Sequence, residues 1–379
     1  MGTNQLLQRF TAPGSKRMLS LDGGGIRGLV ALEYLRRIET LLREQHNNSN
    51  LRLCDYFDLI GGTSTGSLIA CGLALGWTVD DLIKRYEELG RAIFKRRFWK
   101  SWESFYHSNA LEGILRDTLG DKTLGDDSLK TGLCIFCRRL DTGSVWKFVN
   151  HPRAKFFADN SGIRLADLVR ASTAAPTVFK PHSFAVSNTL TELVERGTFI
   201  DGSVGTTHDP SLHLLWVATL KGFPFRWRAG AEHLSLTSVG TGHWAVDEEF
   251  VAKPWHSLLG WASNVPRLLI SEASTYTQTV MQWISESPTA HDIDREMGNL
   301  QGDTPSHAPL LHYVRYSPLL NRKGFAEINQ STDDATLRKL RSLVDASNVG
   351  PLRKYGQHFA DKHVSTEHFP AAFRRSVEP

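Results

Sequence analysis

Two glycine-rich turns hold the residues whose types and spacing are suited to chemistry. The second of them, GTSTG at residues 62–66, has the GxSxG pattern and lies between an apolar stretch and a stretch of small residues. A sharp turn between a strand and a helix lifts a serine hydroxyl clear of the sheet, and glycines at positions 62 and 66 leave room for it. The N-terminus of the following helix also favours developing negative charge. The pattern indicates that Ser64 is a nucleophile, with a helix-capping serine as the alternative.

The first turn, DGGGIRG at residues 22–28, has the backbone that such a nucleophile needs. Successive N–H groups at Gly23, Gly24 and Gly25, before a helix, are expected to form an anion-binding nest suited to the oxyanion of acyl transfer. Residues 23–28 also match GxGxxG, the dinucleotide fingerprint. Its ribose-binding acid, however, belongs at the end of a second strand, and neither Glu44 nor Asp55 occupies that place. A dinucleotide-dependent enzyme is therefore the weaker alternative.

A nucleophilic serine needs a base, and Asp201 is the candidate. It ends the stretch Thr198-Phe199-Ile200 and is followed by Gly202. A carboxylate shielded from water binds a proton more tightly, so it can accept the serine proton directly. A Ser–His–Asp esterase remains an alternative, because the chain has 15 histidines; the two nearest other motifs are His182 and His208.

Strand-like and helix-like stretches alternate over the first half of the chain. Strands are expected at 18–21, 56–60, 133–138 and 145–149, and helices at 26–42, from 67 and at 78–86, where Thr78 and Asp81 resemble a capping box. This alternation predicts a three-layer α/β/α sandwich with a largely parallel central sheet. After Pro210 the alternation blurs. We expect an N-terminal segment (1–17), a catalytic domain (18–212) and a C-terminal extension (213–379) that completes the fold.

Composition limits the classes of function. Hydrophobic residues make up 41% of the 379 residues and charged residues 22%, as in a soluble globular enzyme. The net charge of +4 is too weak to predict binding of DNA or RNA duplexes, although it suits an anionic membrane surface. We expect no signal peptide, because the first residues are polar, and no apolar run reaches the roughly 20 residues of a membrane span. Peripheral membrane contact from the cytoplasm is therefore expected.

The pair Cys134 and Cys137 forms a lone CxxC motif. It falls on an expected strand, where positions three apart point to opposite faces, so chelation of a metal by this pair is disfavoured. We interpret both cysteines as structural and expect no metal site.

Four blocks, in order, resemble patatin-like phospholipases: residues 22–28, 62–66, 171–179 (ASTAAPTVF) and 201–202. The resemblance covers residues 18–210 and implies a Ser–Asp dyad without a metal or other cofactor. Ser64 attacks a membrane phospholipid ester, Asp201 is the base, and the oxyanion hole lies at residues 23–25. The residues that support these motifs are Arg27, which also steers phosphate, Gly28, Gly62, Gly66 and Gly202. The chain departs from the family at Ser203, where Gly or Ala is usual, and at Asp209, where Asn is common.

Chains of this length with a similar C-terminal end also resemble bacterial anti-phage effector phospholipases of the type known as CBASS. This implies a cyclic oligonucleotide activator, action at the inner membrane surface and a homo-oligomer on activation. Tyr313-Val314-Arg315-Tyr316 offers groups that stack on and pair with a nucleotide, with an ordinary strand as the alternative. A non-catalytic nucleotide-binding protein is a further alternative.

An aromatic and basic stretch at residues 94–105 has Phe94, Phe98, Trp102 and Phe105 at helical spacing, with lysines and arginines between them. Such a helix suits a membrane interface, and a stripe that packs in the core is the alternative.

Overall fold

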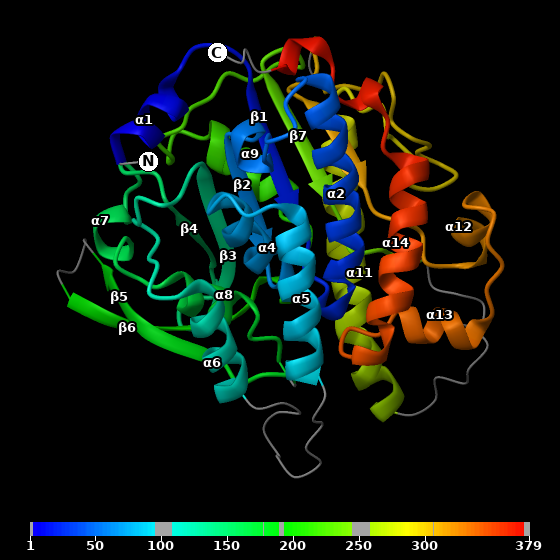
Figure 1. Cartoon of the computed structure of the whole chain (residues 1–379), viewed down its shortest axis with the longest axis horizontal. Coiled ribbons are helices and arrows are strands. Elements are labelled where there is room, and N and C mark those ends of the chain that lie inside the picture. The colour runs from blue at the N-terminus through cyan, green and yellow to red at the C-terminus, as the bar shows by residue number, and fades with distance from the viewer. Residues whose placement is uncertain are drawn as a thin grey trace.

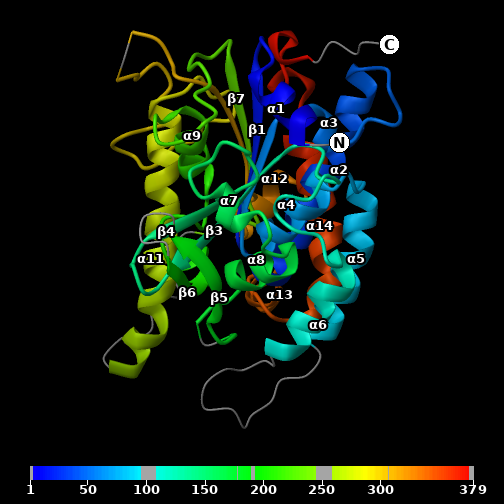
Figure 2. The same cartoon turned by 90° about the vertical axis from the view of Figure 1, so that its left-hand side faces the viewer.

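The computed structural model describes residues 3–94, 108–176, 178–188, 193–244, 258–305 and 307–374. Its centre is a single sheet with helices on both faces, as Figures 1 and 2 show. The predicted α/β sandwich is confirmed.

Five parallel strands form the middle and one side of this sheet, in the spatial order β3-β2-β1-β7-β8. They are β1 (Lys16–Leu21), β2 (Leu59–Thr63), β3 (Gly132–Arg139), β7 (Leu234–Val239) and β8 (His312–Tyr316). Three antiparallel strands complete the other side: β4 (Val145–Val149), β5 (His182–Asn188) and β6 (Leu193–Asp201). All residues of β1, β2, β7 and β8 are buried, as expected of parallel strands covered on both faces.

The helices divide between the two faces of the sheet (Figure 2). One face carries α2 (Gly28–Gln45), α4 (Thr65–Ala74), α5 (Val79–Phe94) and α14 (Val349–His363). The other carries α9 (Ser211–Thr219) and α11 (Leu258–Trp283). The remaining helices are α1 (Thr3–Thr11), α3 (Leu53–Tyr56), α6 (Ser108–Leu119), α7 (Phe157–Asn160), α8 (Leu165–Ser172), α12 (Arg322–Glu327) and α13 (Asp334–Leu340).

Short 3₁₀ turns connect several of these elements. They are η1 (Gly25–Arg27), η2 (Gly202–Val204), η3 (Ala346–Asn348), η4 (Thr366–His368) and η5 (Ala371–Phe373). The first two matter for the site, because η1 joins β1 to α2 and η2 directly follows β6.

Most predicted elements of the first half are present, with two corrections. Tyr56 ends the helical turn α3 and β2 begins only at Leu59, because Asp55 bonds the backbone of Arg52 and holds that turn. The capping box holds: Asp81 N–H donates to the Thr78 hydroxyl at 3.1 Å, and Thr78 N–H donates to Asp81 at 3.4 Å. The helix that it starts runs on to Phe94 rather than ending at Tyr86. The aromatic and basic segment predicted after Phe94 lies outside the described residues.

Residues beyond 212 contribute directly to the sheet. Strand β7 pairs with β1 along its whole length, and β8 pairs with β7. Helix α14 packs along α2 in Figure 1. The C-terminal part therefore shares the core with the part before it, and the boundary at residue 212 stays a prediction.

Strand β3 explains how two distant turns meet. Along one edge it pairs with β2 up to Phe136 opposite Thr63, and with β6 from Cys137 opposite Asp201. Its other edge is occupied by β4 at these same positions. Consequently β2 and β6 end head to head on one edge of β3, and the chain leaves both strands at the same place.

Candidate active site

Ser64 occupies the sharp turn between β2 and α4. Its backbone has φ 53° and ψ −125°, a conformation that costs a residue with a side chain free energy and is typical of a nucleophile elbow. The two flanking glycines are required by close contacts: a Cβ on Gly62 would lie 2.1 Å from the Gly66 carbonyl oxygen, and one on Gly66 would lie 2.3 Å from the Leu21 carbonyl oxygen. The turn therefore leaves no room for a side chain at either flanking glycine position.

The Ser64 hydroxyl donates a hydrogen bond of 2.6 Å to Oδ2 of Asp201. Oδ1 of the same carboxylate accepts the Ser203 backbone N–H at 2.8 Å. Burial raises the pKa of Asp201 to about 6, and the bonds from Ser64 and Ser203 limit that rise. At neutral pH the carboxylate is therefore ionised, yet it is a stronger base than an exposed aspartate.

Ser172 holds this pair from behind and was not identified from the sequence. Its hydroxyl accepts the Ser64 backbone N–H at 2.8 Å and donates to the Phe136 carbonyl on β3 at 2.7 Å. Two residues later, the Ala174 carbonyl accepts the Asp201 N–H at 3.1 Å. The block at 171–179 therefore braces both members of the pair. Its match to the family was the only signal in the sequence.

The glycine-rich turn lies against Ser64, since a Cβ on Gly23 would be 3.3 Å from the Ser64 Cβ. The N–H of Gly23 donates to the His208 carbonyl at 3.1 Å, which corrects the prediction that it serves as an oxyanion donor. Among the described residues, no acceptor is found for the N–H groups of Gly24 and Gly25. The carbonyl of Gly25 accepts bonds from the Thr65 and Tyr86 hydroxyls, which fixes the orientation of its peptide.

Arg27 is placed differently from its predicted role in steering phosphate. The side chain is buried, donates to the Gly242 carbonyl at 2.9 Å and lies 4.9 Å from the Trp244 ring. Burial lowers the pKa of Arg27 to about 10. The prediction was wrong because a sequence motif does not reveal that a segment 215 residues away covers this side chain. Its contacts are those of a residue that supports the turn, the other role expected of it.

The structure places a histidine near the pair but not within it. Nδ1 of His208 lies 3.4 Å from the Cβ position of Gly23, which borders Ser64. Burial lowers the pKa of His208 to about 4, and Nδ1 finds no hydrogen-bond partner in the described part of the chain. His182 instead faces Glu112 and Asp167. Because Ser64 bonds Asp201 directly, this geometry does not support a serine–histidine–aspartate relay.

A buried ion cluster lies behind the glycine-rich turn. Arg315 on β8 donates to both oxygens of Asp22, at 2.8 and 2.5 Å, and its Nη1 lies 3.4 Å from Asp209. Burial raises the pKa of Asp22 to about 7, although Arg315 opposes that rise. No sequence motif pointed to Arg315 in this role, but Asp209 did stand out as a departure from the family.

Strand β8 is not a nucleotide platform. Tyr313 and Tyr316 are fully buried, Tyr316 bonds His368, and Arg315 is engaged by carboxylates. The strand alternative is therefore the one that the structure shows for residues 313–316.

The two cysteines of the CxxC motif lie on a buried strand. Cys134 and Cys137 are free and buried on β3, and burial holds the pKa of the Cys137 thiol well above its usual value. Within the described ranges, no group of three or more His, Cys, Asp or Glu side chains is gathered so as to hold a metal ion. In the same ranges, no helix is both long enough and apolar enough to cross a membrane.

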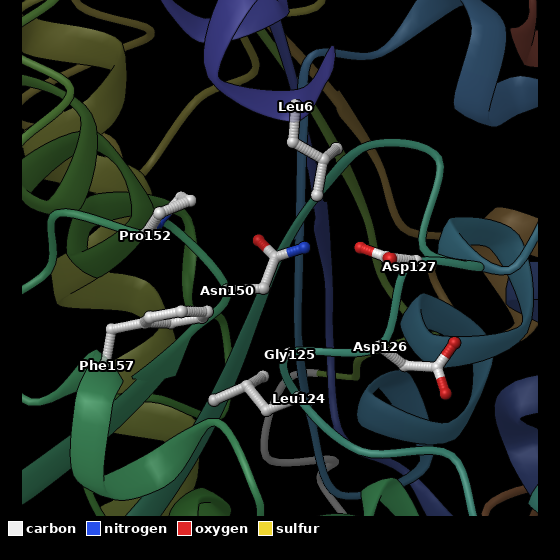
Figure 3. Close-up of a pocket in the computed structure, with 8 residues that line it drawn as sticks. All are labelled: Leu6, Leu124, Gly125, Asp126, Asp127, Asn150, Pro152 and Phe157. Carbon is white, nitrogen blue, oxygen red and sulfur yellow. The ribbon is translucent and has the colours of Figure 1, made fainter. Parts of the chain in front are cut away.

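A small hollow lies away from this site, between α1 and the loop after α6 (Figure 3). Leu6, Asp126 and Asn150 are among the residues that line it. The Asn150 amide bonds the backbone of Thr131 and Leu133, so it connects the end of β4 to the start of β3.

A serine on a nucleophile elbow, a buried carboxylate and a glycine-rich turn on an α/β sandwich together define the class of serine acyl hydrolases. The model of the patatin-like phospholipase family matches residues 19–209, half of the chain. The chain therefore belongs to the patatin-like phospholipase family.

Two curated relatives come from Solanum tuberosum. Patatin-1-Kuras 2 is 30% identical over 237 residues, which are 59% of this chain and 62% of that protein. The chain thus covers about three fifths of that relative's length. Probable inactive patatin-3-Kuras 1 is 27% identical over 355 residues, 86% of this chain and 92% of that protein. Among solved structures, VipD from Legionella pneumophila matches 93% of this chain and 68% of its own at 12% identity, with a TM-score of 0.33.

Proposed function

We propose that the chain is a lipid acyl hydrolase of the phospholipase A type, with Ser64 as nucleophile and Asp201 as its base. The observation that carries the proposal is the 2.6 Å hydrogen bond from the Ser64 hydroxyl to Asp201, made at a strained turn next to the glycine-rich turn, where the described residues supply no acceptor for the Gly24 and Gly25 amides. One relative is described as probably inactive, so family membership by itself does not establish turnover. The proposal depends on the site.

Acylation follows from this arrangement. Asp201 takes the Ser64 proton as Oγ attacks the ester carbonyl, and the carbonyl oxygen becomes an oxyanion within reach of the Gly24 and Gly25 N–H groups. Collapse of the intermediate breaks the bond to the glycerol oxygen, which leaves with the proton from Asp201. The fatty acyl group remains on Ser64 as an ester.

Deacylation uses the same groups in reverse. Asp201 removes a proton from water, the hydroxide attacks the acyl-enzyme carbonyl, and Ser64 leaves with that proton. The products are a fatty acid and a lysophospholipid. Patatin-like phospholipases need no cofactor, and none takes part in these steps.

Exposed apolar side chains beside the site support contact with a membrane. Val204, three residues after Asp201, is 44% exposed, and Leu343, whose carbonyl accepts the Ile26 N–H, is also exposed. Leu269 on α11 is 64% exposed, with the exposed Arg267 two residues away. Apolar and cationic groups together suit an anionic lipid surface. We infer that the chain acts as a peripheral protein at the inner membrane surface.

Mass spectrometry of products from mixed phospholipid vesicles tests the hydrolase proposal. The wild type is expected to release free fatty acid and lysophospholipid, and Ser64→Ala to lose activity by on the order of 10⁴-fold or more. A fluorophosphonate probe should label Ser64 alone. The matched control is Ser183→Ala, which removes a half-buried serine on β5. Turnover that is unchanged in Ser64→Ala would reject the Ser–Asp dyad. Activity that is lost in His208→Gln but kept when Asp201 is replaced would reject it as well.

Regulation by a cyclic oligonucleotide, a role in anti-phage defence and oligomerisation on activation rest on the resemblance alone. If they hold, basal vesicle hydrolysis is low and rises sharply with one member of a panel of cyclic di- and trinucleotides, with a larger species in light scattering. An unchanged rate of hydrolysis across the panel would overturn activation by a cyclic oligonucleotide and leave the hydrolase proposal intact.

A further inference from the structure

The glycine-rich turn is held mainly by residues that lie after the family match. The Thr241 hydroxyl donates to the Gly23 carbonyl at 2.9 Å, and the Ile26 N–H donates to the Leu343 carbonyl at 2.9 Å. The carbonyl of Gly242 accepts the Arg27 guanidinium. The family model ends at residue 209, so these contacts come from a part of the chain that the model does not cover.

Arg315 makes the strongest of these connections. Its two terminal nitrogens bind the two oxygens of Asp22, the residue at the start of the turn, and Nη1 also donates to Ser238 at 2.6 Å. A bidentate pair fixes the plane of a carboxylate as well as its distance. Asp209, just beyond His208, lies on the same guanidinium at 3.4 Å. One side chain therefore joins the start of the turn to the loop whose His208 carbonyl binds Gly23.

The three side chains of this contact are buried. Arg315 is only 8% exposed, Asp22 3% and Asp209 1%. A buried charge without its partner is costly, so loss of one member forces the others to move or to change protonation. Such movement reaches the Gly24 and Gly25 amides directly, because they follow Asp22 by two and three residues.

We propose that Arg315 is a positioning residue for acyl transfer: through Asp22 and Asp209 it sets the glycine-rich turn at the distance from Ser64 that oxyanion stabilisation requires. This inference rests on the proposed hydrolase function and extends it, because it makes residues 213–379 part of the active-site architecture. Arg315 itself touches no reacting atom.

The required accuracy explains why a remote side chain matters. A displacement of about 1 Å in a catalytic group can cost about 10²-fold in rate. Lysine keeps the positive charge but has one nitrogen in place of a planar fork, so it cannot hold both carboxylate oxygens in one plane. Arg315→Lys therefore separates the charge from the geometry.

The test compares Arg315→Lys with Arg17→Lys. Arg17 is the matched control: it is 7% exposed, lies at the opposite end of the same sheet and pairs with one buried carboxylate, Asp58. Both variants are assayed on a soluble short-chain ester for kcat and KM, and for the rate of labelling of Ser64 by a fluorophosphonate. Melting temperatures are measured on the same samples.

We expect both variants to melt at lower temperature than the wild type. Arg315→Lys should lose about 10- to 100-fold in kcat and in labelling rate with KM within about threefold, whereas Arg17→Lys keeps both rates. The proposal is overturned if Arg315→Lys keeps a kcat within threefold of the wild type, or if Arg17→Lys loses as much.

Thr241 keeps the test decisive should Arg315→Lys fail to fold. Thr241→Val removes the hydrogen bond to Gly23 at nearly constant volume, and Thr241→Ser restores the hydroxyl. A several-fold fall in kcat in the first, recovered in the second, supports positioning from beyond residue 209; equal rates in the two variants overturn it. Failure of the hydrolase proposal is recognised separately, because the wild type would then show no turnover that depends on Ser64.

Discussion

A buried ion cluster lies at each end of β1, and the two clusters have opposite ratios of cations to carboxylates. At the amino end, two guanidinium groups share one carboxylate: Arg17 and Arg9 both bind Asp58. At the carboxyl end, one guanidinium is shared by two carboxylates, since Arg315 binds Asp22 and faces Asp209. The first cluster has an excess of positive charge and joins residues within 49 positions of one another. The second has an excess of negative charge and spans 293 positions.

This difference separates a structural ion cluster from one that borders a reaction. At the amino end the second guanidinium, that of Arg9, also donates to the backbone carbonyls of Asp55 and Phe57. At the carboxyl end burial raises the pKa of Asp22 to about 7, with a smaller contribution from the second carboxylate, although Arg315 opposes the rise. Perturbed carboxyl groups gather where function is expected. The predictions below test whether the two ends differ in this way.

The largest expected effect is at the carboxyl end. Asp201→Asn removes the base, and we expect kcat for a soluble ester to fall by about 10⁴-fold. Stability should be retained or rise, because burial disfavours the charged carboxylate. Steady-state kinetics and thermal melting measure the two effects. A variant that keeps a tenth of the activity would show that another group accepts the Ser64 proton.

The amino end should show the opposite pattern. Asp58→Asn leaves Arg17 and Arg9 without their common partner, and the free energy of unfolding should fall by about 3–5 kcal/mol. The kcat of the folded enzyme should stay within about threefold of the wild type. Urea unfolding and kinetics below the transition check this. If Asp58→Asn lowers the kcat of the folded enzyme as well as the free energy of unfolding, the two ends are not functionally distinct.

A smaller effect is expected at Ser172, which braces the catalytic turn. Ser172→Ala leaves the buried Ser64 N–H without an acceptor, at a cost of about 1–3 kcal/mol in the free energy of unfolding. Displacement of Ser64 should lower kcat by about 10- to 100-fold with little change in KM. Ser183→Ala is the control, and equal behaviour of the two variants would argue against a brace.

The pH dependence should follow Asp201. Only its carboxylate form accepts a proton, so kcat/KM for a soluble ester should fall as the pH decreases through about 6, by about tenfold per unit below it. Circular dichroism over the same range separates this fall from unfolding. A profile that stays flat down to pH 5 would contradict a base with a raised pKa.

The smallest effect is expected at Ser203, where the family usually has glycine or alanine. Its bond to Asp201 comes from the backbone N–H, which glycine retains. Ser203→Gly should therefore change kcat by no more than about threefold. A larger loss would show that the hydroxyl, which lies beside Gly23, takes part in the reaction.

Features that depend on neighbouring residues could be predicted before the fold was known. The GxSxG turn, the Thr78 capping box and the alternation of strands and helices depend on neighbouring residues, so the sequence alone predicted an α/β sandwich and placed Ser64 on a turn. The predicted start of β2 was wrong for a local reason as well. The apolar residues there favoured a strand, but Asp55 stabilises a helical turn.

Only the tertiary structure decided which distant groups meet. Ser64 and Asp201 come together because β2 and β6 end on the same edge of β3, and strand pairing between remote segments leaves no signal in a single sequence. For the same reason the sequence did not indicate the roles of Ser172 and Arg315, and the phosphate-steering role predicted for Arg27 was not found. The sequence determined the chemistry that each turn offers; packing of the strands determined which turns face each other.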